Sequence, residues 1–161
     1  MREELYTILE NDQICFRESE NAENSYKVGL ALAQKEQTTR IFEIMEREFG
    51  VKLKVYYGIN VDPQHSSVSK VVPLLRTIDN YALFSLYTVA QQAKSTAIAL
   101  SFLLRNELSI EEAVNIARVD ENYQTKHFGR VEGAHDYDEA NTTVTFATAK
   151  NIINLCMLRP Q

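Results

Sequence analysis

Apolar residues recur every three or four positions along most of the chain, as they do on one face of an α-helix. This spacing predicts a mainly α fold of about five to six helices. The segments with this pattern are residues 1–10, 27–49, 66–78, 81–104, 110–126 and a last helix from Asp136 or Asp138 to Leu158. The expected buried side of that last helix carries Ala140, Val144, Ala147, Ile152, Leu155 and Leu158.

Several predicted helix ends carry residues that favour a start or a stop. Gly50 is typical of a helix C-terminus, because glycine tolerates the left-handed backbone found there. Asp79 is a candidate N-cap for the apolar helix that follows it. Ser109 and Glu112 have the spacing of a capping box. Pro73 is expected to break or kink the helix around it.

Two segments have the pattern of extended structure. Residues 12–17 form a short apolar run, and residues 52–59 alternate so that Leu53, Val55 and Tyr57 share one face. The predicted fold class is therefore mainly α with one or two short extended segments.

Length and composition favour one globular domain with its own core. The chain has 161 residues, of which 45% are hydrophobic and 24% charged. Its 17 basic and 22 acidic residues give a net charge of −5, which argues against a nucleic-acid surface. The apolar segment 81–104 is long enough to span a bilayer, but Gln91, Gln92 and Lys94 lie at its middle. We therefore expect a core helix and no membrane span.

Motifs for catalysis are missing from the sequence. It contains no GxSxG, GxxxxGK[ST] or GxGxxG segment, and neither Cys15 nor Cys156 has neighbours that would activate a thiolate. The two cysteines are also too few and too far apart for a disulfide framework or a zinc site. The chain is therefore expected to be a binding protein and not an enzyme, with no cofactor and no metal.

One alternative is a helical metal-dependent phosphohydrolase that uses a His-Asp doublet. It would take His135 and Asp136 as the doublet and His65 as a further ligand, because imidazoles and carboxylates bind divalent cations. The sequence favours a simpler role for the doublet, in which both side chains cap the start of the last helix.

Several segments resemble one known family when they are taken together. They are Val89-Ala-Gln-Gln-Ala-Lys-Ser95, Leu108-Ser-Ile-Glu-Glu-Ala-Val114, Ala117-Arg-Val-Asp-Glu-Asn-Tyr-Gln124, Phe128-Gly-Arg-Val-Glu132 and His135-Asp-Tyr137, with Asp12-Gln-Ile-Cys-Phe-Arg17 and Gln34 upstream. This set resembles the assembly chaperones of the ATP synthase F1 sector that bind the free α subunit. The similarity covers nearly the whole chain.

The resemblance implies a fold, a function and a partner. Members of that family have an N-terminal β domain and a C-terminal helical domain, so residues 1–161 are expected to be a single helical domain, the C-terminal part of a longer two-domain chaperone. The implied function is to bind the free F1 α subunit and prevent its aggregation until it pairs with β. The expected protein is a monomer of the mitochondrial matrix, or of the cytoplasm in a bacterial source.

The resemblance also implies a partner-binding site. The family places an important acidic residue after an Arg-Leu or Arg-Val pair, and Asp120 occupies that position here. Asp120 is expected to be a charge partner for the α subunit. The residues that match the motif around it are Arg118, Glu121, Gln124, Glu132, His135 and Asp136. This chain has no Trp, and the family's Trp positions fall at Phe128, at Gly133 and within residues 38–40.

Overall fold

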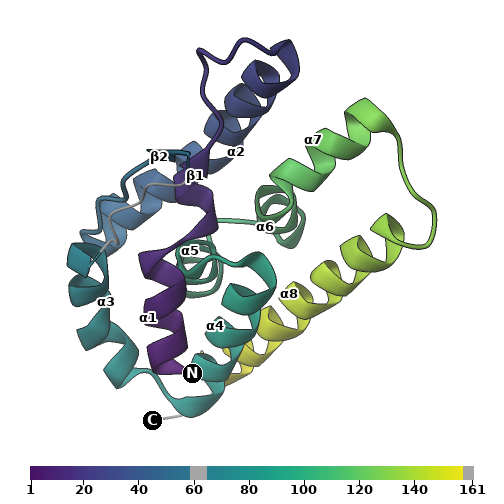
Figure 1. The fold of residues 1–161 in the computed structure, drawn as a ribbon. Coiled ribbons are helices and arrows are strands. Elements are labelled where there is room, and N and C mark those ends of the chain that lie inside the picture. Colours follow the sequence, from purple (N-terminus) through teal and green to yellow (C-terminus); the bar gives the residue numbers. More distant parts are fainter. Residues whose placement is uncertain (59–64, 158–161) are drawn as a thin grey trace.

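The structure is a computed structural model that describes residues 1–58 and 65–157 (Figure 1). Within these residues, the elements are eight α-helices, one 3₁₀ turn and two short strands. The helices are α1 (Arg2–Glu10), α2 (Ser25–Phe49), α3 (His65–Thr77), α4 (Asn80–Ala93), α5 (Thr96–Arg105), α6 (Ile110–Ala117), α7 (Val119–Phe128) and α8 (His135–Met157). The other elements are η1 (Gln13–Cys15), β1 (Phe16–Arg17) and β2 (Tyr56–Tyr57). The mainly helical prediction is confirmed, but eight helices exceed the expected five to six.

The predicted helix signals act as expected. The side chain of Asp79 accepts hydrogen bonds from the backbone N–H groups that open α4, and Ser109 and Glu112 form both bonds of a capping box at α6. Gly50 ends α2 with φ of +64°, a left-handed backbone. Pro73 is the exception, because α3 continues on both sides of it and is not broken there.

The predicted helix over residues 81–104 is wrong, because the chain forms two helices there. Lys94 adopts a left-handed backbone with φ of +50° and ends α4. Ser95 then caps α5, and its hydroxyl accepts a hydrogen bond from the N–H of Ile98 at 3.0 Å. A break at a capping serine lets α5 leave at a new angle while its first N–H groups stay bonded.

The predicted helix over residues 110–126 is also two helices. Arg118 lies between α6 and α7 with φ of −116° and ψ of 23°, outside the helical range. Its side chain is buried and binds Asp138 of α8, so the break occurs where the chain is tied to another helix.

The last helix begins at His135, but its predicted buried side is wrong. Val144 and Leu155 are each 64% exposed and Ala140 is exposed, while Leu158 lies outside the described residues. Ala147 and Ile152 are only partly buried. The residues that are buried are Thr142, Phe146, Ala149, Lys150 and Ile153.

Polar residues on this buried side explain the error. Thr142 accepts a hydrogen bond from Gln92 of α4 at 2.9 Å. Lys150 donates to the carbonyl oxygen of Phe102 at 2.7 Å, and its ammonium lies 4.7 Å from the centre of the Phe102 ring. Because Thr142 and Lys150 are hydrogen-bonded inside the protein, the buried face of α8 includes polar residues. The spacing of apolar residues alone therefore did not identify that face.

The extended structure is shorter than predicted. β1 and β2 pair in parallel, with Phe16 opposite Tyr56. The strand expected over residues 52–59 is therefore limited to two residues among those described, and residue 59 lies outside them. Leu53 is buried whereas Tyr57 is 60% exposed, so the predicted common face is not formed.

The core is built around α5. Eight of its ten residues are buried, and α1, α2, α4, α6 and α8 all pack against it (Figure 1). Phe102 of α5 and Phe146 of α8 are the largest fully buried side chains, with ring centroids 5.4 Å apart. None of the described helices is long and apolar enough to cross a membrane.

A buried aspartate links the N-terminal segment to the start of α5. Asp12 has no exposed surface, and its carboxylate accepts hydrogen bonds from the N–H of Ala97 at 2.9 Å and the N–H of Ile14 at 3.4 Å. Burial raises the pKa of Asp12 to about 7, although hydrogen bonds from Ser95 and Ala97 act against that rise.

This raised pKa predicts a pH-dependent stability. The folded state holds a proton on Asp12 up to about pH 7, whereas an unfolded aspartate loses its proton near pH 4. The contribution of Asp12 to stability is therefore complete below about pH 4 and is lost as the pH rises through about 7. The loss is on the order of 1.4 kcal/mol for each unit by which the pKa is raised.

Asp12→Asn removes the titrating group and keeps a carbonyl oxygen that accepts from Ala97. We expect the wild type to lose unfolding free energy relative to Asp12→Asn between pH 4 and pH 8, because only the wild type must ionise a buried group. Urea unfolding followed by circular dichroism at several pH values measures this difference. A difference that stays constant over that range would contradict the assignment.

Candidate partner-binding surface

The predicted site residues lie on α7, on the loop after it and on the first turns of α8. α7 packs against α2 and has no fully buried residue (Figure 1). The chain from Gly129 to Ala134 then connects α7 to α8, and both Gly129 and Gly133 have positive φ, of +90° and +78°. A helix without buried residues depends on a few specific contacts for its position.

One of these contacts is an aromatic cluster between α2 and α7. Tyr26 of α2 lies 5.2 Å from Tyr123, 5.0 Å from His127 and 5.0 Å from Phe128, measured between ring centroids. Partial desolvation raises the pKa of Tyr26, and the nearby Tyr123 and Asp120 act in the same direction. Phe128 is nevertheless 75% exposed, so the cluster presents an aromatic surface to the solvent.

The close approach of Tyr123 to α2 requires a glycine. A Cβ placed on Gly29 would lie 2.0 Å from the hydroxyl oxygen of Tyr123 and 3.1 Å from the ring carbon that carries it. Tyr123 is also held between Tyr26 and His127, which limits its freedom to move aside. Gly29 therefore sets how close α7 lies to α2.

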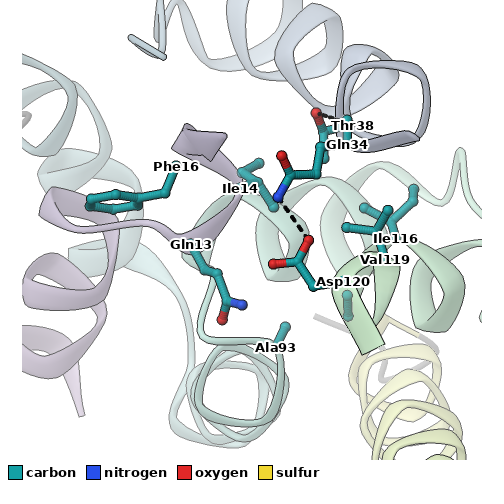
Figure 2. Close-up of a pocket in the computed structure, with 10 residues that line it drawn as sticks. Gln13, Ile14, Phe16, Gln34, Thr38, Ala93, Ile116, Val119 and Asp120 are labelled. Carbon is teal, nitrogen blue, oxygen red and sulfur yellow. Dashed lines mark hydrogen bonds between the residues drawn. The ribbon is translucent and has the colours of Figure 1, made fainter. Parts of the chain in front are cut away.

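Asp120 faces α2 and is not displayed on the outer surface of α7. The side-chain amide of Gln34 donates to its carboxylate at 2.8 Å, and the amide oxygen of Gln34 accepts from the N–H of Glu18 at 2.9 Å (Figure 2). Burial raises the pKa of Asp120, with smaller contributions from Glu121 and Glu18 in the same direction, and the bond from Gln34 opposes the rise. The carboxylate therefore has a structural contact with α2, and its role toward a partner stays a prediction.

Figure 2 shows the small pocket into which this pair points. Its walls come from η1, α2, α4, α6 and α7, and apolar side chains such as Ile14, Phe16 and Ile116 form much of its lining. Gln34 lies in the polar middle of α2, where periodicity gave no sign that it is buried. Only the resemblance to the chaperone family singled it out.

Arg118 and Glu121 lie on the other side of α7, toward α8. Arg118 is only 6% exposed, and its guanidinium donates to Asp138 at 2.6 Å. Its Nε and the Oε2 of Glu121 are both buried and have no hydrogen-bond partner within the described part of the chain. Asp138, which sequence reasoning placed only at the start of a helix, is the charge partner of Arg118.

The remaining candidates divide between the connecting loop and the exposed surface. The imidazole Nδ1 of His135 accepts a hydrogen bond from the N–H of Val131 at 3.0 Å, and Asp136 forms an ion pair with Arg130. Gln124 and Glu132 are exposed. The seven candidates therefore do not form one cluster. One contacts α2, two lie toward α8, two bind residues of the connecting loop and two are exposed.

The metal-dependent alternative gains no support from the arrangement. Residues 1–58 and 65–157 contain no group of three or more His, Cys, Asp or Glu placed to hold a metal ion. His65 begins α3 and His135 begins α8, and in Figure 1 α3 lies on the opposite side of the molecule from the first turns of α8. The side chain of His65 is outside the described residues.

Comparisons with known proteins identify the fold. No protein-family model matches the chain. The chain is similar to the crystal structure of Atp12 from Paracoccus denitrificans, with a TM-score of 0.84 and 19% identity over 96% of this chain and 63% of that one. A variant of the same protein with an aspartate replaced by lysine gives the same values. Atu1473 from Agrobacterium tumefaciens, a proposed chaperone, gives a TM-score of 0.77 and 20% identity over 95% of this chain and 55% of that one.

The fold is therefore one that is found in a proposed chaperone. More particularly, it is the Atp12-like fold, in agreement with the resemblance found in the sequence. The chain spans less than two thirds of the length of these structures, at 63% and 55%.

The contact between Gly29 and Tyr123 predicts a specific pattern of stability. Gly29→Ala should lower the free energy of unfolding by about 1 kcal/mol or more, because overpacking at the helix contact outweighs the better helix propensity of alanine. Adding Tyr123→Phe removes the clashing oxygen and should restore most of that loss. Urea unfolding of both single variants and the double variant measures the coupling. If the changes in unfolding free energy of the two substitutions simply add, Tyr123 and Gly29 do not interact.

Proposed function

We propose that this chain is an assembly chaperone that binds the free α subunit of the ATP synthase F1 sector. The observation that carries the proposal is the Atp12-like fold over 96% of the chain, together with the family-like segments, three of which lie on α7, the loop after it and the start of α8. The proposed role is to cover a surface of α that would otherwise aggregate and to release it when β arrives. Release by competition requires only that β binds the shared surface of α more tightly.

The surface around α7 has features that suit a protein partner. Phe128, Val131 and Tyr137 are 75%, 60% and 73% exposed, and all three lie at the end of α7, on the loop or at the start of α8. Aromatic side chains bury large areas on binding and are common at the centres of protein interfaces. Residues 118–139 also contain six acidic and three basic side chains, which favours a basic rim on the partner.

The proposed compartment follows from the partner. A chaperone of the F1 α subunit would work where that subunit folds, in the mitochondrial matrix or in the cytoplasm of a bacterium. We also propose that the chain acts as a monomer and that it needs no nucleotide, because competition by β supplies the free energy of release.

Selective capture tests the proposed partner. The chain carrying an affinity tag is co-expressed with α, with β or with an unrelated protein of similar size, and the bound protein is quantified. We expect α to be retained in clear excess over β and over the unrelated protein. Equal or absent capture of α would contradict the proposed function.

The role of Asp120 is tested by two substitutions with a matched control. Asp120→Lys should abolish rescue of ATP synthase assembly in cells that lack their own chaperone, because the charge at the expected contact is reversed. Asp120→Asn keeps an oxygen that accepts from Gln34, so it should fold normally while lowering rescue through the loss of charge. Glu36→Lys makes the same charge reversal at an exposed position of α2 and should leave rescue unchanged.

Thermal unfolding of each purified variant separates a binding defect from a folding defect. Full rescue by Asp120→Lys would remove Asp120 from the site. Loss of rescue by Asp120→Lys with normal rescue by Asp120→Asn would show that only the added lysine interferes.

A further inference from the structure

A polar cleft lies between α7 and α8. Its inner part is lined by residues that include Gln92, Arg118, Glu121 and Thr142, and its outer part by residues that include Asn122 and Arg130. Arg118 borders both parts and is the lining residue that they share. In Figure 1 the two helices diverge, and the loop from Gly129 to Ala134 connects them at the open end.

The inner part of this cleft contains two charged groups with unused hydrogen-bonding capacity. Arg118 is 6% exposed, and although its Nη1 binds Asp138, its Nε–H is buried without a partner among the described residues. Glu121 borders the same part of the cleft, and its Oε2 is likewise buried and unpaired. Buried polar atoms are nearly always hydrogen-bonded, because leaving one unpaired costs about 1–3 kcal/mol.

These two groups define the chemistry of a ligand. Arg118 Nε offers a donor and Glu121 Oε2 offers an acceptor, so a complementary group must present one acceptor and one donor. A peptide group has both, in its C=O and N–H. A phosphate or carboxylate could accept from Arg118 but has no N–H to donate to Glu121, and both anionic and cationic side chains, such as Asp138 and Lys126, border the cleft.

The rest of the cleft also suits an extended polypeptide. Asn122 and Thr125 line its outer part and can bond to further backbone groups. The exposed apolar side chains of Phe128, Val131 and Tyr137 lie on the α7 end, the loop and the α8 start that surround its open end. Backbone bonding inside and apolar contact outside would bind a segment with little dependence on its sequence.

We propose that the cleft between α7 and α8 binds an extended segment of the client protein, whose backbone accepts from Arg118 Nε and donates to Glu121 Oε2. The identity of the client as the F1 α subunit rests on the proposed function, whereas the cleft and its ligand chemistry rest on the geometry alone. Asp120 and Gln34 line a separate pocket next to α2 and are not part of this site.

A conservative variant tests the proposal. Glu121→Gln has nearly the shape of the native side chain and removes the charge that accepts the client N–H. We expect it to weaken binding by about five- to tenfold, because a neutral amide oxygen replaces a charged acceptor. Glu43→Gln makes the same change at an exposed position of α2 and should leave affinity unchanged. Thermal unfolding checks that both variants are folded.

Cross-linking locates the client directly. A photoreactive amino acid replaces Asn122 on the cleft wall or, as a control, Glu43 on α2, and each complete chain is exposed to the α subunit and to a library of overlapping 15-residue peptides. Cross-links from position 122 to α, lost with Glu121→Gln, would support the proposal. If α is captured with equal affinity by Glu121→Gln and cross-links form only from position 43, the cleft is not the binding site, although the proposed function stands.

The peptide library separates the two proposals when α is not captured. Peptide cross-links from position 122 that depend on Glu121 would then support the cleft and overturn the F1 α subunit as its client. If neither α nor any peptide cross-links from position 122, the cleft holds only solvent and the inference is overturned.

Discussion

The fold depends on hydrogen bonds to the backbone N–H groups at the start of one buried helix, α5. α5 is almost entirely enclosed by other helices, so the N–H groups of its first turn have no access to bulk water. Ser95 and Asp12 accept their hydrogen bonds, while Thr96 donates to the carbonyl oxygen of Leu5 and the N–H of Gln13 donates to the carbonyl oxygen of Lys94. The three bonds made by Leu5, Asp12 and Gln13 tie the N-terminal segment to the break between α4 and α5.

This central junction determines where the candidate site can form. α4 and α5 pack against α8, and α2 and α5 pack against α6. α7 follows α6 at Arg118 and has no core contact of its own, so its position follows from Gly29, from the Gln34–Asp120 hydrogen bond and from the ion pair between Arg118 and Asp138. A surface helix held by these contacts and by the packing of Tyr26 on Tyr123 still leaves Phe128 exposed to a partner.

The features that could be predicted from sequence are those with local causes. Asp79, Ser109 with Glu112, and Gly50 act on backbone groups within a few positions, and their effects are as expected. The break at Arg118 could not be predicted because its partner Asp138 is distant, and the break at Lys94 combines a local cap, Ser95, with a distant contact from Asp12. The buried face of α8 was missed because Thr142 and Lys150 are paired with residues of α4 and α5.

The candidate site shows the same difference between features with local causes and features that depend on distant residues. The resemblance indicated one segment of chain, but it could not show that Asp120 points toward α2 while Glu121 points into the cleft with α8, since adjacent helical residues lie about 100° apart. Gln34 and Asp138, the partners of the predicted Asp120 and Arg118, lie 86 and 20 positions away from them. Such pairings depend on tertiary packing and are absent from local patterns.

Under the proposed function, this chain holds the F1 α subunit and passes it to β. Light scattering during refolding of purified α measures this holding activity. We expect about one chain per α subunit to suppress aggregation, the same amount to leave aggregation of an unrelated protein unchanged, and added β to displace the chain from α. If α aggregates at the same rate with and without the chain, the proposed function is wrong.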